Sequence, residues 1–203
     1  GYYSVQKNSP VMSGNHEGVA PPTTDPIPTP TPEPIPTPTP EPTPTPEPTP
    51  TPPTTKIIKG TSASNVLDGT SGNDKIYGYG GDDRINGHGG SDVLTGGAGQ
   101  DAFVFNTKLS SNTHTQITDF VSSKTGDWFE LDHNIFGNIK TGTLSNANFW
   151  VGTKAHDADD RIIYNNKTGV IYYDADGSGK GAAVEVATLT NHSKLIAADF
   201  YVF

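Results

Sequence analysis

A nine-residue repeat constrains the fold of this 203-residue chain more than any other feature. Four units follow one another without a gap: GTSGNDKIY (69–77), GYGGDDRIN (78–86), GHGGSDVLT (87–95) and GGAGQDAFV (96–104). Each carries Gly at its first and fourth positions, Asp at its sixth and a large apolar residue at its eighth. Such a period predicts a stack of similar short elements, because one unit cannot bury its apolar residue alone. A fifth unit, GTSASNVLD (60–68), has Asn65 in place of the aspartate and is expected to cap the stack.

Each unit combines a turn with a short strand. Glycine lets the backbone turn tightly and exposes carbonyl oxygens, and the three residues after the aspartate are long enough for a strand with one inward side chain. Stacked units would bury a column formed by Ile76, Ile85, Leu94 and Phe103. The turns would then present rows of carboxylate and carbonyl oxygens, hard ligands that suit Ca²⁺ better than zinc or copper.

Two structural alternatives use no metal. A flexible glycine-rich linker would not keep an apolar residue in register every nine positions. A β-helix without metal would leave its row of aspartates unneutralised. The chain has no cysteine, so disulfides, thiolate zinc sites and a cysteine nucleophile are excluded.

The repeats resemble the glycine- and aspartate-rich nonapeptides of the RTX family, whose pattern is G-G-x-G-x-D-x-U-x with U a large apolar residue. Proteins of that family are exported by bacterial type I secretion, and two of their nonapeptides make one turn of a parallel β-roll. The resemblance implies a calcium-binding β-roll over residues 60–104, with ions between loops 18 residues apart.

The resemblance also implies which residues bind Ca²⁺, with two main sites and a third. The first ion would take carbonyl oxygens of Thr70, Gly72, Gly87 and Gly89 with the carboxylates of Asp74 and Asp92. The second would take carbonyl oxygens of Tyr79, Gly81, Gly96 and Ala98 with Asp83 and Asp101. The third would combine Thr61, Ala63 and Asn65 with Gly78, Gly80 and Asp83, and Asn65 makes it weaker because a charge is missing.

Residues 105–203 show apolar alternation broken by polar turns, which predicts further short strands. We expect strands at 115–120, 127–131, 148–151, 161–165, 170–174 and 183–189, and a helical turn at 193–198. The predicted core contains Phe105, Ile117, Phe120, Phe129, Leu131, Phe149, Ile162, Ile171, Val184, Val186 and Leu189. The fold class is therefore all-β: a parallel β-roll that continues into a C-terminal β-sandwich-like region.

This C-terminal region resembles the one that follows the repeats in RTX secreted proteins. The similarity lies in residues 100–105, 117–120, 159–165 and 172–177. The last five residues, Asp199 to Phe203, are an acidic residue followed by apolar ones, as in the uncleaved type I export signals of that family. The resemblance implies a type I exporter as a partner and an extracellular location. The same residues also suit an ordinary last strand.

The N-terminal quarter of the chain has a different character. All prolines except Pro10 lie between Pro21 and Pro53, in a Thr-Pro-Thr-Pro-Glu-Pro pattern that predicts an extended polyproline II linker over residues 21–55. Such a disordered but stiff linker would reach roughly 110 Å. The chain begins with Gly rather than Met, so we expect a processed or excised fragment, and residues 1–20 are expected to be the tail of an upstream domain or unstructured. Gly14–Glu17 matches the Gly-Asn-His-Glu motif of metallophosphoesterases, but the partner motifs are missing and we interpret the match as chance.

Charge and hydropathy exclude several partners. The net charge of −9 argues against nucleic acid, which is bound by clustered Lys and Arg. No stretch approaches the roughly 18 apolar residues of a membrane span, so no membrane insertion is expected. The first residues also lack the basic flank and apolar segment of a signal peptide.

Two acidic segments outside the repeats resemble functional sites. Residues 174–179 begin like an EF-hand loop, but the residue at position 12 is Glu185, inside a predicted strand, so a hairpin turn is favoured over an extra calcium site. His156, Asp157, Asp159 and Asp160 offer acid–base groups, and we interpret them as a solvated loop.

The sequence therefore predicts a non-catalytic calcium-binding module that folds after type I export and carries the secretion signal for an upstream extracellular domain. Any reaction of the parent protein is expected in that upstream domain. An alternative is a calcium-dependent polysaccharide-binding or surface-binding module of a carbohydrate-active enzyme, for which Lys75, Tyr77, Tyr79 and Arg84 are candidate contacts. A small hydrolase within residues 105–203 is a third hypothesis, although no nucleophile–base pair is visible there.

Overall fold

The computed structural model describes residues 55–203. The tail predicted for residues 1–20 and all of the predicted linker except Thr55 lie outside the described residues, so both stay predictions.

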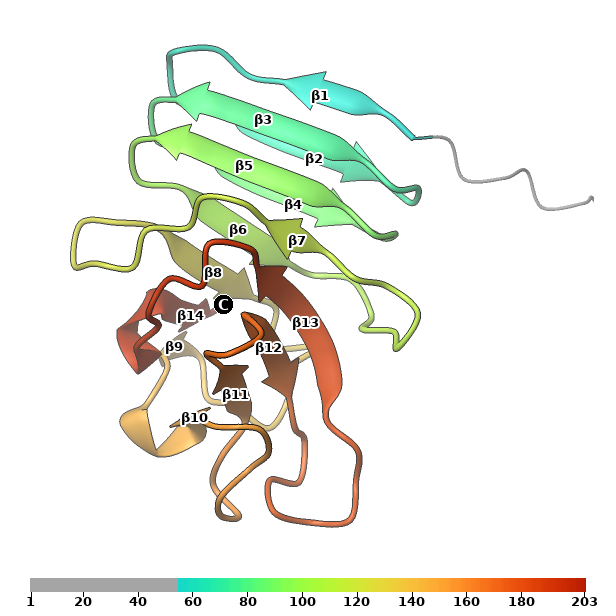
Figure 1. Ribbon diagram of the computed structural model, residues 1–203, viewed down its shortest axis with the longest axis vertical. Coiled ribbons are helices and arrows are strands. Elements are labelled where there is room, and N and C mark those ends of the chain that lie inside the picture. The colour runs from blue at the N-terminus through green and yellow to red at the C-terminus, as the bar shows by residue number, and fades with distance from the viewer. Residues whose placement is uncertain (1–54) are drawn as a thin grey trace, which may run out of the picture. The chain divides into compact units, whose positions relative to one another are not determined.

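The repeats form a parallel β-roll whose strands alternate between two sheets (Figure 1). Sheet A receives β1 (Ile57–Lys59), β3 (Lys75–Gly80) and β5 (Val93–Ala98), and sheet B receives β2 (Val66–Thr70), β4 (Arg84–His88) and β6 (Ala102–Phe105). Every neighbouring pair within the roll is parallel. Residues 18 positions apart are partners, as in the pair Lys75 and Val93. Two nonapeptides therefore make one turn, and the predicted β-roll is confirmed.

The strands of the roll are longer than the three residues expected from the sequence. β3 and β5 have six residues each, because pairing continues past the apolar position into the glycines that open the next unit. Gly78 and Gly96 thus belong to strands, and the sharp turns begin only after Gly80 and Ala98.

The predicted apolar column is buried. Ile76, Ile85 and Phe103 are fully inaccessible, and Leu94 is 1% exposed. Ile76 is the register partner of Leu94, and Ile85 is the partner of Phe103. One residue per nonapeptide thus fills the space between the sheets.

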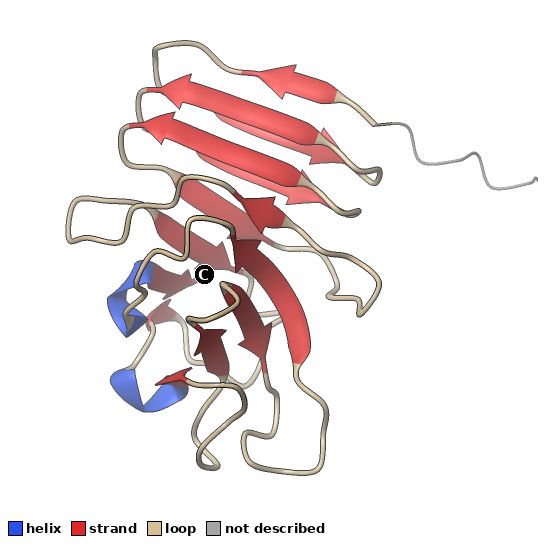
Figure 2. Cartoon of the chain, in the orientation of Figure 1, coloured by secondary structure: helices blue, strands red, loops and turns tan. Residues whose placement is uncertain are grey.

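The two sheets continue without a break into the C-terminal region (Figure 2). Sheet A has the order β1-β3-β5-β7-β13-β12-β11-β10, and sheet B has the order β2-β4-β6-β8-β14-β9. The added strands are β7 (Gln116–Ile117), β8 (Trp128–Leu131), β9 (Gly142–Thr143), β10 (Phe149–Val151), β11 (Ile162–Asn165), β12 (Val170–Tyr173), β13 (Val184–Leu189) and β14 (Phe200–Val202). Strands β11, β12 and β13 are antiparallel neighbours, while β7 and β8 extend the parallel roll.

All six strands predicted after the repeats exist within their expected ranges, although β7 covers only two residues. The predicted helical turn at 193–198 is displaced, because the 3-10 helix η2 spans Ala197–Asp199; a second one, η1, spans Asn146–Asn148. The short strands β1 and β9 were not predicted from the sequence. The final strand β14 lies inside sheet B, parallel to β8 and antiparallel to β9.

Most of the predicted C-terminal core is buried, but Phe105, Phe149 and Val184 are only half-buried. Phe129 lies between Phe120 and Phe200, with ring centroids 4.6 Å away on each side. This stack joins the end of the roll to the last strand. Buried apolar residues of this region that were not predicted from the sequence are Phe136, Ile139, Leu144, Ala155, Ile163, Tyr164, Tyr173, Ala187, Leu195, Ala197, Phe200 and Val202.

Candidate calcium sites

The turns of the roll form two rows at opposite ends of its strands (Figure 1). In the first row the turns before β3 and β5 carry Asp74 and Asp92. In the second row Asn65, Asp83 and Asp101 precede β2, β4 and β6. The structure therefore brings together the residue pairs that the 18-residue spacing predicted, one turn apart along each row.

One oxygen of each loop aspartate is held by the backbone of the preceding turn. The N–H of Asp74 donates to Oδ1 of Asp92, and the N–H of Asp83 donates to Oδ1 of Asp101, both at 2.9 Å. The N–H of Asn65 donates to Oδ1 of Asp83 at 2.7 Å. These bonds form a ladder that fixes the carboxylates within the stack.

Within residues 55–203, the other oxygen has no hydrogen-bond partner in three of the four aspartates. Oδ2 is buried and unpartnered in Asp83, Asp92 and Asp101, and none of these residues is more than 2% exposed. No Lys or Arg in residues 55–203 forms an ion pair with any of them. A buried carboxylate without a partner is strongly unfavourable, so these atoms fit a bound cation. Asp74 differs, because its Oδ2 accepts from the N–H and the hydroxyl of Thr70.

Glycine at the first position of each unit makes room for the carboxylate. A Cβ at Gly78 would overlap Oδ2 of Asp83 and the carbonyl oxygen of Gly96, which belongs to the next turn. A Cβ at Gly87 would overlap Oδ2 of Asp92 in the same way. The backbone at Gly78 and Gly87 is not left-handed, in contrast to Gly81, whose φ is 83°. Glycine is therefore needed at the first position so that the carboxylate can come close to the backbone, and not for a left-handed turn.

The predicted carbonyl ligands lie in the same turns. The carbonyl of Gly87 lies beside Gly69 near Oδ2 of Asp74, and the carbonyl of Gly78 lies beside Gly60 near Oδ1 of Asn65. The carbonyl of Thr70 also accepts the N–H of Gly89 at 3.2 Å. The remaining predicted carbonyls belong to the same rows of turns: Gly72 and Gly89 in the first, and Thr61, Ala63, Tyr79, Gly80, Gly81, Gly96 and Ala98 in the second.

Burial changes the proton affinity of these carboxyls. It raises the pKa of Asp92 and of Asp101 from 3.8 to about 6, and neighbouring aspartates add to the effect. Burial also raises the pKa of Asp83. In the absence of metal, the folded roll thus resists full ionisation of its own ligands.

The second row continues beyond the repeats through two aspartates that were not predicted as site residues. Oδ1 of Asp127 accepts the N–H of Asp101 at 3.0 Å, as a further repeat would do. Asp119 accepts the N–H groups of Gly96 and Gly97 at 3.0 and 2.8 Å. The sequence contains a signal for Asp127, because Asp127-Trp128-Phe129 repeats the Asp-x-apolar part of the nonapeptide.

The two acidic segments outside the repeats are organised as loops. Oδ2 of Asp160 accepts the N–H groups of His156 and Asp157 at 2.6 and 3.0 Å, while His156 and Asp157 are exposed. Ligand atoms of these three residues lie within 4.8 Å of one another. Glu185, at position 12 of the EF-hand-like segment, instead contacts Nδ1 of His114 through Oε2 at 3.0 Å, so this segment does not assemble an EF-hand ligand set.

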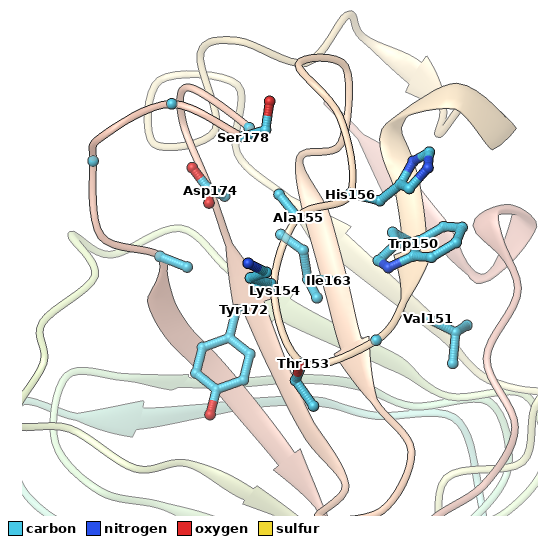
Figure 3. A pocket seen from close by; sticks show the side chains of 15 residues that line it. Trp150, Val151, Thr153, Lys154, Ala155, His156, Ile163, Tyr172, Asp174 and Ser178 are labelled. Atoms are coloured by element: carbon cyan, nitrogen blue, oxygen red, sulfur yellow. The ribbon is translucent and has the colours of Figure 1, made fainter.

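A cleft of about 880 Å³ lies between the loop that follows β10 and the loop that joins β12 to β13. Figure 3 shows Trp150 and His156 on one side of this cleft and Asp174 and Ser178 on the other. The rings of Trp150 and His156 are stacked with centroids 4.5 Å apart, and Trp150 is 39% exposed. The cleft combines an aromatic surface with charged and hydroxyl groups.

The residues proposed for a polysaccharide-binding strip do not all share one face. In sheet A, every second residue of β3 belongs to this set, from Lys75 through Tyr77 to Tyr79. The two tyrosine rings are stacked, with centroids 6.2 Å apart. Arg84 lies in β4 of sheet B, where it pairs with Glu130 at 2.8 Å. The strip is therefore limited to β3.

Comparison with known proteins identifies the repeats. The model of the RTX calcium-binding nonapeptide repeat matches residues 59–94 and 81–105, with four copies. No curated protein matches the chain. Among solved structures, the AlgE6R3 subunit of the Azotobacter vinelandii mannuronan C5-epimerase aligns with 22% identity and a TM-score of 0.47, over 72% of this chain and 77% of that one. The described residues contain no helix with the length and hydropathy of a membrane span.

The raised pKa values predict an inverted pH dependence in calcium-free protein. A carboxyl whose pKa is higher in the folded chain than in the unfolded one stabilises the fold when protonated, and this stabilisation is lost as the pH rises from about 4 to about 6. We expect metal-free protein to show a stronger β-sheet circular dichroism signal at pH 5 than at pH 7.5. In saturating Ca²⁺ the protein should instead be more stable at pH 7.5 than at pH 5, because protons and metal compete for the same oxygens.

Circular dichroism spectra of metal-free protein at pH 5 and pH 7.5, and thermal melts in calcium at both pH values, test this, with the double variant Asp92→Asn/Asp101→Asn as the control. The metal-free spectrum of the variant should depend much less on pH. A metal-free protein that is equally stable or less stable at pH 5 would contradict the assignment of these carboxyls.

Proposed function

We propose that residues 60–203 form a non-catalytic module that folds on binding Ca²⁺ after type I export and carries the export signal for an upstream extracellular domain. Two calcium ions bind in the sites of Asp74 with Asp92 and of Asp83 with Asp101. A third binds more weakly at Asn65. The partners are calcium ions, the exporter and the upstream domain in cis, and the reaction of the parent protein belongs to that upstream domain.

The buried, unpartnered Oδ2 atoms of Asp83, Asp92 and Asp101 carry this proposal. Without a cation, folding must bury three ionised oxygens that lose their water and gain no partner, which costs several kcal/mol for each ion. With Ca²⁺ the same oxygens become ligands, so the binding free energy becomes folding free energy. The charge of the loops thus makes folding conditional on calcium.

This dependence supports the proposed order of export and folding. In a low-calcium cytoplasm the repelling aspartates keep the chain unfolded and able to pass a narrow exporter. Outside the cell, calcium near the roughly 10⁻⁴–10⁻³ M dissociation constants of extracellular modules drives folding. The proline-rich linker, which lies outside the described residues, would separate the folded module from the upstream domain.

The C-terminal tail serves two roles in this proposal. Phe200 and Val202 are fully buried in β14, whereas Tyr201 and Phe203 are 47% and 42% exposed. An unfolded chain would present all four apolar residues to the exporter, and folding would then bury half of them. The tail can therefore act as a signal before folding and as a strand afterwards.

A calcium titration of the chelator-treated chain tests the conditional fold. Far-ultraviolet circular dichroism should change from a largely unfolded spectrum to a β-rich one, with a midpoint at about 10⁻⁴–10⁻³ M Ca²⁺. The variant Asp83→Asn should raise this midpoint at least ~10-fold, which corresponds to about 1.4 kcal/mol, because a buried ligand loses its charge.

Asp82→Asn is the matched control, because Asp82 is the exposed neighbour of Asp83 and only caps the N–H of Gln100 at 2.9 Å. Its midpoint should stay within about twofold of the original, as expected for a surface substitution. A chain that is equally β-rich in chelator and in millimolar calcium would refute the switch.

The export signal is tested through its exposed residues. We expect Tyr201→Ser with Phe203→Ser to reduce secretion through a type I exporter by at least fivefold, because the apolar pattern of the tail is lost. The melting temperature in calcium should change by only about 2 °C, since both side chains are on the surface. Secretion is measured as the extracellular fraction of the full chain, with Ile57→Ser and Val66→Ser as exposed apolar controls. Unchanged secretion would place the signal elsewhere.

Polysaccharide binding is a second candidate function, and the cleft beside Trp150 favours it. Sugar rings stack on exposed aromatic side chains, and Lys154, Asp174 and Ser178 line the same cleft with groups that hydrogen-bond hydroxyls. This site lies in the C-terminal region and is separate from the strip on β3.

A glycan array in the presence of calcium tests this candidate. Trp150→Ala should weaken binding to any glycan that the chain retains by at least ~10-fold, while Tyr79→Ala should leave it unchanged. The reverse result would move the binding face to β3, and the absence of any bound glycan would remove this function.

A further inference from the structure

A small cavity lies at the end of the first row of loops, between the last repeat loop and the segment that follows the repeats. Its volume is about 40 Å³, and its wall includes Gly87 and Asp92 of the last loop in that row. Thr113 and Thr115 contribute from the segment that replaces the next repeat, and Glu185 contributes from β13. A cavity of this size holds one ion or one to two waters and is too small for an organic ligand.

The topology explains why these residues meet. Strands β5, β7 and β13 are parallel neighbours in sheet A, so all three begin at the same edge. Asp92 directly precedes β5 and Thr115 directly precedes β7. In β13, Thr188 is the register partner of Gln116 in β7. Glu185 is the second residue of β13 and lies three positions before Thr188, so it is also near this edge.

Asp92 supplies an oxygen that nothing in residues 55–203 satisfies. Its Oδ1 accepts the N–H of Asp74, toward the preceding turn. Its Oδ2 is buried without a hydrogen-bond partner and lies against Gly87, which lines the cavity. Asp92 as a whole is 1% exposed, so water outside the protein does not solvate this oxygen.

Glu185 supplies a second carboxylate to the same cavity. Its side chain is 17% exposed, its Oε1 accepts the hydroxyl of Thr188 and its Oε2 pairs with His114, both at 3.0 Å. Lys108 also lines the cavity, but within residues 55–203 it forms no ion pair with Asp92 or Glu185. Two carboxylates with threonine and backbone oxygens make a hard donor set of the kind that binds Ca²⁺.

We propose that this cavity binds one calcium ion, held between Asp92 of the last first-row loop and Glu185 of β13, so that the carboxylate of Asp92 bridges this ion and the ion of the repeat site with Asp74. The proposal extends the calcium-binding function proposed above to a site whose second half lies outside the repeats. The ion joins the roll to the C-terminal region across three parallel strands, so loss of calcium loosens both parts together.

The variant Glu185→Gln of the full chain tests the site. Glutamine keeps the size of the side chain and an acceptor for Thr188 while it removes the charge. Isothermal titration with Ca²⁺ should show one ion fewer per chain than the unmodified protein. The melting temperature in millimolar calcium should fall by several degrees, and binding at the repeat sites should persist.

His114→Gln is the matched control. It removes the imidazole that contacts Glu185 but leaves the carboxylate free to bind the metal. The number of bound ions should therefore stay the same. If His114→Gln and Glu185→Gln gave equal losses of stability with no change in the number of ions, Glu185 would serve only the contact with His114.

A crystal structure of the unmodified chain grown in calcium provides a measurement that does not depend on a variant folding. Anomalous density for calcium in the cavity supports the proposal, whereas a water there overturns it. An unchanged ion count in Glu185→Gln also overturns this site but leaves the repeat sites intact. Failure of the calcium binding proposed for the repeats would instead appear as an unmodified chain that binds no calcium.

Discussion

The rest of the structure depends on the uncompensated charge of the loop aspartates. The backbone N–H of the preceding turn fixes one oxygen of Asp83, Asp92 and Asp101, and the other oxygen is buried without a partner. The ladder therefore aligns the carboxylates but cannot neutralise them. The apolar column and these carboxylates are buried in the same turns of the roll, so a bound cation would stabilise the fold wherever the column forms.

The same ladder links the roll to the C-terminal region. Asp127 occupies the place of the next loop aspartate and accepts the N–H of Asp101, although it comes 26 residues later instead of 18. Both sheets pass through this junction, and the stack of Phe120, Phe129 and Phe200 fills the space between them. The repeats and the region after them thus share one core, and the last strand is an internal part of sheet B.

The repeat pattern predicted the roll well because each nonapeptide contains all its local determinants: the turn glycines, the ligand and the buried residue. Prediction was weaker where burial depends on partners distant in sequence. Phe200 was not among the predicted core residues, yet it is fully buried because β8 and β9 flank it. Arg84 looked like a possible surface contact for a polysaccharide, yet it pairs with Glu130, 46 residues away.

The sequence by itself determined the period, the column of Ile76, Ile85, Leu94 and Phe103, and the choice of oxygen ligands for calcium, because these follow from the residues inside each unit. Only the tertiary structure decided which groups complete the ends of the two rows. Asp119, Asp127 and Glu185 lie outside the repeats, and no spacing rule relates them to the loop aspartates. They reach those loops because parallel strands from distant segments begin at the same edge of a sheet, which is a property of the folded topology.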